Sequence, residues 1–123
     1  MIFCSKNENG EPAWKLIQEG NKIVTRRLKP VDVGKIIAIQ PNRCKKAIGH
    51  IKVVSCMLHQ TWLRSYVPDG LYWTEENLTA KKIMDDEAKR EGFLSYHGLR
   101  AWLYSHGISE MDTYRIEFIY LGE

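Results

Sequence analysis

The stretch "EGNKIVTRRLKP", Glu19 to Pro30, decides how this chain is interpreted, because it concentrates basic residues within a short segment. It contains four of the chain's 18 Lys and Arg residues: Lys22, Arg26, Arg27 and Lys29. A single Thr25 lies among them. Polar side chains this close together can hold an anion or polarise a carbonyl group. A solvated, positively charged turn is the simpler interpretation, because most charged side chains are exposed.

The residues just before this stretch predict a short amphipathic helix that begins after Pro12. Three apolar residues fall on one face of it: Ala13, Leu16 and Ile17. Gly20 stands where a left-handed residue commonly ends a helix. Lys22 is therefore expected just beyond the helix end.

Two β-branched runs after the stretch predict a β-hairpin, one at 34–40 and one at 47–58. Its loop carries three basic residues: Arg43, Lys45 and Lys46. Gly49 within the second run indicates a bulge or a close approach of another chain segment. Residues 1–6 predict a further short strand, which a turn at Asn9 and Gly10 ends.

The second half of the chain predicts two short helices and a last strand. Residues 59–83 show weak periodicity and are expected to be mainly irregular. Asp85 is expected to cap a helix that ends before Gly92, and Ser95 to cap a second helix. Trp102 lies on the apolar face of that second helix and is expected in the core. Residues 114–121, "YRIEFIYL", alternate as a strand does.

Length and composition limit the classes of protein that fit. The chain has 123 residues, of which 44% are hydrophobic and 27% charged, so one soluble globular domain over residues 1–123 is expected. Its net charge of +3 permits an anionic partner. Cys4, Cys44 and Cys56 lack paired spacing, which argues against a disulfide framework, and no apolar run approaches a membrane span. A cytoplasmic location is therefore expected.

Four residues of the basic stretch give the pattern G-x-K-x-x-T-x-R: Gly20, Lys22, Thr25 and Arg27. This pattern resembles the signature of the ASCH family, a branch of the PUA-like superfamily, and "TRRLKP" is especially similar to bacterial and phage members. The segments "EAKREGF" (87–93) and "GKIIAIQPNRCKKAIGHIKV" (34–53) are also similar to parts of that family. One departure lies at Pro30, where the longer family pattern has a lysine, while Lys29 comes one position earlier.

The resemblance implies an α+β fold, a small PUA-like β-barrel flanked by short helices, with the motif facing a cleft. It implies that the cleft binds RNA or a nucleotide. An alternative, implied by small amidohydrolases of the family, is removal of the acyl group from N4-acetylcytidine. The catalytic residues carried over by motif are then Lys22, Thr25 and Glu91. A further alternative is cleavage of RNA, in which the same Lys and Thr stabilise charge on a phosphate.

This catalytic set is chemically coherent. Burial near Arg26 and Arg27 would lower the pKa of Lys22, so that its neutral amine accepts a proton from Thr25 or from water. Thr25 would attack the amide carbonyl or orient the water that does. Glu91 would relay a proton to the leaving cytosine amine and hold Lys22 in place. Two simpler roles stay open: Thr25 caps a turn, and Glu91 only pairs with Lys22.

Further residues are candidates for binding the ligand. Six basic residues can attract phosphates: Arg26, Arg27, Lys29, Arg43, Lys45 and Lys46. The last three fit a merely solubilising loop equally well. Three aromatic residues can stack on a base or line the cleft: Trp14, Tyr72 and Trp73. Cys56 and His59 are separated by two residues, but no second close pair completes a zinc site. No dinucleotide motif occurs either, so neither a metal nor a cofactor is expected.

Overall fold

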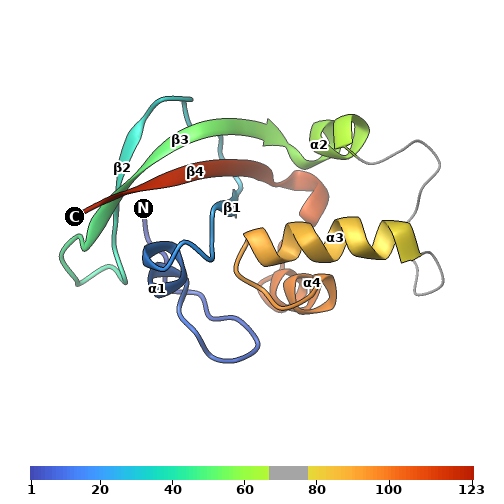
Figure 1. The fold of residues 1–123 in the computed structure, drawn as a ribbon, viewed down its shortest axis with the longest axis horizontal. Helices are drawn as coiled ribbons and strands as arrows, with labels where there is room; N and C mark the ends of the chain where they lie inside the picture. The colour runs from blue at the N-terminus through green and yellow to red at the C-terminus, as the bar shows by residue number, and fades with distance from the viewer. Residues whose placement is uncertain (67–77) are drawn as a thin grey trace.

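The computed structural model of the protein describes residues 1–66 and 78–123. Along the chain the elements are α1 (Ala13–Gln18), β1 (Val24–Arg27), β2 (Ile36–Ile39), β3 (Gly49–Leu58), α2 (His59–Tyr66), α3 (Leu78–Arg90), α4 (Tyr96–Ser105), the 3₁₀ helix η1 (Glu110–Asp112) and β4 (Tyr114–Gly122). Figure 1 shows the strands as one curved layer, with α1, α3 and α4 below it in this view and α2 at the end of β3. The α+β class expected from the sequence is confirmed.

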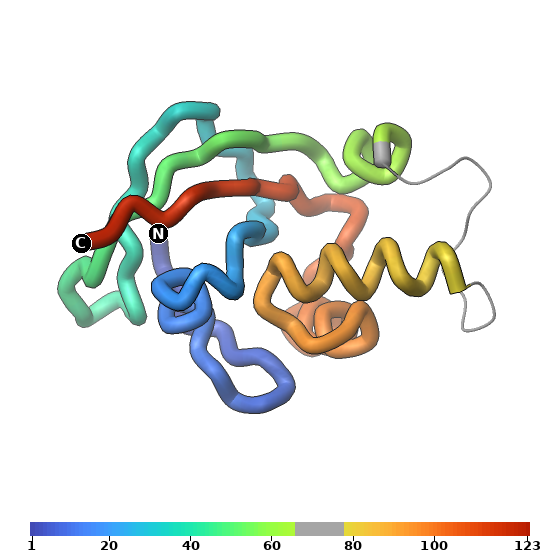
Figure 2. The backbone as a smooth tube through the Cα atoms, viewed as in Figure 1, coloured from blue at the N-terminus to red at the C-terminus, as the bar shows by residue number. Residues whose placement is uncertain are grey.

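Four antiparallel strands form the sheet in the order β1-β4-β3-β2. The long strands β3 and β4 lie at its centre, and Figure 2 shows both chain ends toward the end of the molecule opposite α2. A Cβ on Gly49 would lie 2.8 Å from the ring of Tyr120, so this close approach requires glycine. The strand register also shifts between His50 and Ile51, as a bulge does. The interpretation of Gly49 is thereby confirmed.

The sheet is open, so the small β-barrel expected from the family resemblance is wrong. Closure requires the two edge strands to pair, but β1 is bonded to β4 and β2 to β3. The N-terminal segment lies along the end of β2, where Phe3 N donates to the Gln40 oxygen and Gln40 N to the Met1 oxygen, each at 2.9 Å. From the β1 side, Arg27 Nη2 donates to the Ile2 oxygen at 2.8 Å. A side chain, and not a strand ladder, therefore spans the gap between the sheet edges.

Two apolar clusters form the core. The first joins α1, the N-terminal segment and the sheet: Phe3, Ala13, Ile17, Ile39, Ile51 and Phe118. The second joins α2, α3 and α4: Trp62, Met84, Ala88, Tyr96, Leu99 and Leu103. The two halves of the molecule thus have separate apolar centres, and polar contacts near β1 and β4 lie where they meet.

Two buried ion pairs tie the sheet to α3. Arg115 of β4 donates from Nε to both carboxylate oxygens of Glu87, each at 3.0 Å. Arg26 of β1 donates from Nε to Glu91 Oε1 at 2.9 Å. Arg26 and Arg115 are paired positions on neighbouring strands, while Glu87 and Glu91 are one helical turn apart. The spacing of the strands therefore matches the spacing of the carboxylates along the helix.

Several elements lie where the sequence predicts them. The first helix, α1, is followed by Gly20 at φ +77°. Ser95 caps α4, since its Oγ accepts from Gly98 N at 3.2 Å. The hairpin strands and the last strand are confirmed as β2, β3 and β4. Residues 1–6 form two single bridges in place of the strand expected there.

Three elements differ from the expectation. β1 lies inside the basic stretch, where no strand is predicted, because four residues are too few for a periodic signal. α2 occupies part of the region expected to be irregular; it buries His59, which counts as polar in a sequence pattern. α3 begins at Leu78 and not near Asp85; before Asp85 only Ala80 and Met84 are buried, which is too few positions to give a helical pattern in the sequence. Asp85 instead accepts from Tyr96 N at 2.9 Å.

No helix in residues 1–66 and 78–123 is both long and apolar enough to cross a bilayer. The cytoplasmic location and the single-domain organisation over residues 1–123 stay predictions.

Removing the charge of Glu87 should destabilise the fold strongly. Glu87→Gln leaves the buried guanidinium of Arg115 without its main partner, and breaking such a pair costs about 3–5 kcal/mol. Urea unfolding followed by tryptophan fluorescence measures the loss. Glu19→Gln is the matched control, because the Lys15–Glu19 pair is exposed and 3.9 Å apart, and such pairs contribute at most about 1 kcal/mol. Equal losses for the two variants would contradict the structural role of the buried pair.

Candidate functional site

Lys22 lies directly after α1, and its side chain is buried. The chain turns back there, so that Lys22 N donates to the Leu16 oxygen at 3.1 Å. Its Nζ donates to the Val24 oxygen at 2.7 Å and to the main-chain oxygen of Glu91 at 2.8 Å, and the residue is only 5% exposed. Gly92, at φ +92°, packs against the stem of Lys22. The amine is therefore held at the point where β1 meets the end of α3.

Burial lowers the pKa of Lys22 to about 7. The negative charge of Glu91 acts in the opposite direction, while the positive charges of Arg27 and Arg26 lower the pKa further. Near neutral pH a large fraction of this amine is uncharged, which is the form that accepts a proton. This agrees with the reasoning from the sequence about crowding by the two arginines.

Glu91, just beyond α3, is buried and bonded to Arg26 through its carboxylate. Arg26 Nε lies 2.9 Å from Glu91 Oε1, and both side chains are almost fully enclosed. The other oxygen, Oε2, has no hydrogen-bond partner among the described residues. Burial raises the pKa of Glu91, and Arg26 and Lys22 oppose that rise. The carboxylate thus neutralises Arg26, while Lys22 contacts the main chain of the same residue.

Arg26 also begins a chain of hydrogen bonds that leads away from the motif. Its Nη1 donates to His59 Nδ1 at 2.7 Å, so this ring nitrogen must be unprotonated. The proton is therefore on Nε2, which lies 2.7 Å from Glu110 Oε1. Tyr96 donates its hydroxyl to the same oxygen at 2.9 Å. Burial acts against the ionised form of Glu110, but the bonds to His59 and Tyr96 and the charge of Arg26 lower its pKa overall.

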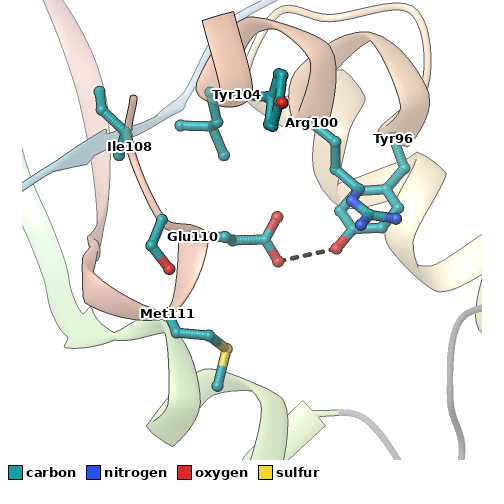
Figure 3. A pocket seen from close by; sticks show the side chains of 8 residues that line it. Tyr96, Arg100, Tyr104, Ile108, Glu110 and Met111 are labelled. Atoms are coloured by element: carbon teal, nitrogen blue, oxygen red, sulfur yellow. Dashed lines mark hydrogen bonds between the residues drawn. The ribbon is translucent and has the colours of Figure 1, made fainter. Parts of the chain in front are cut away.

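A pocket of about 360 Å³ adjoins the far end of this chain. Figure 3 shows the Glu110 side chain pointing toward Tyr96, with one carboxylate oxygen bonded to the tyrosine hydroxyl. Arg100 places its guanidinium over the Tyr96 ring, 5.6 Å from the centroid. Ile108 lines this pocket and also the hollow beside Arg27 that is described below.

Thr25 is buried in β1 but is not joined to the other two residues of the predicted catalytic set. It pairs with Ile116 of β4 and is 5% exposed. Successive strand side chains point to opposite sides, so Thr25 points away from the side on which Arg26 meets Glu91. Among the described residues no hydrogen bond links Thr25 to Lys22 or Glu91. The structure therefore brings Lys22 and Glu91 together and leaves Thr25 apart.

A cleft of about 870 Å³ lies beside the motif, and we call it the Arg27 cleft. It lies between the N-terminal segment, the β2–β3 loop and α4. Five of its lining residues carry charge or aromatic character: Arg27, Arg43, Lys45, Trp102 and His106. A second hollow of about 380 Å³ adjoins it and shares Arg27 and Trp102. Arg26 and Lys29 line this second hollow.

Arg27 is held rigidly in the wall of the cleft. Its Nη2 donates to the Ile2 oxygen at 2.8 Å, and its guanidinium lies over the Phe3 ring, 5.0 Å from the centroid. Nε is enclosed and has no hydrogen-bond partner among the described residues. Burial lowers the pKa of Arg27, and the nearby Cys4 thiol opposes this. The side chain is therefore fixed in the cleft wall, and its unpartnered Nε is buried.

Trp102 and His106 form a stacked pair in the Arg27 cleft. Their ring centroids are 4.1 Å apart and the planes differ by 25°. Trp102 is half-buried and packs on the second core cluster, so its expected core role is confirmed in part, but it also faces the cleft. Sequence reasoning missed this site role and that of His106. The available signal was their spacing of four positions near the end of a helix, which places both on one face.

The other residues expected to bind a ligand are distributed unevenly. Lys46 is exposed on the hairpin loop but is not among the residues that line the cleft. Trp14 is half-buried and packs against the first core cluster. Tyr72 and Trp73 lie outside the described residues. Of the predicted ligand-binding side chains, Arg27, Arg43 and Lys45 are thus the ones gathered around one cleft.

Comparison of the chain with models of known protein families, with curated proteins and with solved structures finds no match. The resemblance to the ASCH family therefore rests on the motif and segments quoted above and stays a prediction.

The lowered pKa of Lys22 should make stability depend on pH. In the unfolded chain the amine titrates near 10.5, and in the folded chain at about 7. Between these values the unfolded state binds more protons, so the contribution of Lys22 to stability rises with pH by up to about 1.4 kcal/mol per unit. Below pH 7 both states are protonated and the contribution no longer changes. Urea unfolding of the wild type and of Lys22→Met from pH 6 to 10 measures this difference. If the difference in unfolding free energy between the two proteins did not change from pH 6 to 10, burial would not lower the pKa of Lys22.

Proposed function

We propose that the protein binds single-stranded RNA, or a nucleotide of it, in the Arg27 cleft. The observation that carries this proposal is the meeting of three cationic side chains and a stacked aromatic pair in one cleft of about 870 Å³. The cations come from β1 and from the β2–β3 loop, and the aromatic pair comes from α4. Elements from distant parts of the sequence thus supply positive charge for phosphates and aromatic rings for bases.

Phosphates supply most of the affinity in this proposal. Arg43 and Lys45 are exposed on the loop and can follow the backbone of a flexible strand, while the fixed Arg27 offers a defined phosphate position. Single strands also gain affinity when bases stack on aromatic rings, by about 1–3 kcal/mol per base. His106 is exposed and already stacked on Trp102, so a base on its outer face would extend the stack.

The resemblance to the ASCH family supports the same proposal. The last residue of the motif, Arg27, lines the cleft. A motif that faces a cleft is what the resemblance implies. The support is independent of the aromatic pair, which the motif does not contain.

Deacylation of N4-acetylcytidine is the second candidate function. The observation in its favour is an amine, Lys22, with a pKa of about 7 close to the carboxyl group of Glu91. In this reaction Lys22 accepts a proton from water, because Thr25 has no hydrogen bond to it among the described residues, and Glu91 delivers a proton to the leaving amine. All three residues are 3–5% exposed, so a substrate must displace neighbouring side chains to reach them. RNA binding ranks first because its cleft is already open.

Neutralising the loop cations should weaken RNA binding and reduce its salt dependence. Fluorescence anisotropy with a labelled single-stranded RNA, repeated over a range of salt concentrations, measures both quantities. The association constant falls as salt rises, and each phosphate contact adds about 0.7 to the steepness of that fall in a plot of log K against log salt. Arg43→Ala and Lys45→Ala each remove one contact, so each should make the fall less steep by about 0.7. His106→Ala should weaken binding about tenfold at constant salt slope.

Lys46→Ala is the matched control for Lys45→Ala, because Lys46 is the adjacent residue and does not line the cleft. It should bind RNA nearly as the wild type does. Undetectable binding by the wild type at low salt, or equal losses for Lys45→Ala and Lys46→Ala, would refute the proposal. The integrity of the RNA after long incubation tests the ribonuclease alternative in the same samples.

Turnover of N4-acetylcytidine to cytidine and acetate tests the second candidate. Lys22→Met and Glu91→Gln should each reduce kcat severely, because residues that act as a unit lose most activity when one is removed. The rate of the wild type should rise with pH around 7, as the amine of Lys22 loses its proton. Absence of turnover by folded wild-type protein from pH 6 to 9 would eliminate this function.

A further inference from the structure

Two of the three cysteines line the Arg27 cleft. Cys4 belongs to the N-terminal segment and Cys44 to the β2–β3 loop, and both are exposed. Cys56 is half-buried in β3 and is not among the residues that line this cleft. The two cleft thiols come from segments 40 positions apart in the sequence. The fold brings them to the same cleft, which their separation in the sequence does not indicate.

The backbone explains why these two segments run together. Ile2 and Gln40 form a parallel bridge, so the chain leaves both residues in the same direction. Cys4 follows two positions after Ile2, as Asn42 follows two positions after Gln40. Asn42 Oδ1 accepts from Cys44 N at 3.0 Å, so the loop turns there. Both thiols therefore lie near the same end of the bridge, and the exposed loop around Cys44 has room to adjust.

The surroundings of the two thiols suit reaction with an oxidant. Arg27, Arg43 and Lys45 line the same cleft and give it positive charge. The thiolate is the reactive form of cysteine, and accessible cysteines in positive surroundings are the ones that oxidise selectively. Cys56 is less accessible, so it is the less reactive of the three.

We propose that Cys4 and Cys44 are a reversible thiol pair, which a peroxide converts into a disulfide across the Arg27 cleft. The Cys4 thiolate attacks one peroxide oxygen and the O–O bond breaks, which gives a sulfenic acid and a hydroxide that becomes water. The Cys44 thiolate then attacks the sulfenic sulfur, the S–S bond forms, and the hydroxyl leaves as a second water. The two thiols lose two electrons and hydrogen peroxide gains them. A small thiol reductant reverses the reaction.

The disulfide closes the cleft between the N-terminal segment and the loop. It draws Arg43 and Lys45 toward Arg27 and occupies the space that a bound strand needs. This effect on RNA rests on the proposed function, whereas formation of the disulfide does not. The two claims can therefore fail separately.

Mass spectrometry of the folded protein after brief treatment with hydrogen peroxide tests the disulfide. The intact monomer should lose two hydrogen atoms, and peptide mapping should show Cys4 joined to Cys44 with Cys56 still available for alkylation. Cys56→Ser should form the same bond, while Cys4→Ser and Cys44→Ser should not. A bond to Cys56, a disulfide-linked dimer, or three free thiols after treatment would each overturn the proposal.

Anisotropy with the same oxidised samples tests the consequence for RNA. The oxidised wild type should bind single-stranded RNA at least about tenfold more weakly than the reduced form, and dithiothreitol should restore binding. Cys44→Ser should keep its affinity under peroxide, which separates closure of the cleft from other oxidative damage. Unchanged affinity in the oxidised wild type would refute the closure. If the reduced protein bound no RNA, the proposed function would fail, while the mass measurement would still decide the thiol pair.

Discussion

The paired arginines and glutamates between the sheet and α3 are the constraint on which the rest of the structure depends. β1 has four residues and bonds to one neighbouring strand, so its ladder alone holds it weakly. Arg26 anchors it to Glu91, and one strand away Arg115 anchors β4 to Glu87. A buried charge without a partner costs several kcal/mol, so α3 has one acceptable position along the sheet.

The site follows from this position of α3. The end of the helix brings the Glu91 oxygen to Lys22, and enclosure there is what lowers the pKa of the amine. Successive side chains of β1 point to opposite sides of the sheet, so neighbouring residues make different contacts. Arg26 is bonded within the interior network, while Arg27 lies in the wall of the cleft. A single short strand thereby places one charge in the interior and the next at the cleft.

Local signals in the sequence predicted the helix before the motif, the hairpin, the cap at Ser95 and the last strand. They failed at His59, because a pattern of apolar residues cannot register a polar group buried at the start of α2. They also missed the first half of α3, where only Ala80 and Met84 are buried. The open sheet was also beyond prediction, since closure depends on whether the N-terminal segment or a strand occupies the edge. The basic residues of the cleft were identified, but Trp102 and His106 were not, because their exposure depends on the neighbouring loop.

The position of Arg27 in the wall between two hollows has a thermodynamic consequence. Because one side chain lines both hollows, binding in one hollow affects binding in the other. Because Arg27 is anchored to the Ile2 oxygen, both hollows face the same guanidinium charge in the same position. An anion in one hollow would use part of that attraction and would repel an anion in the other. Linkage makes this effect equal in both directions, without any change in the shape of the fold.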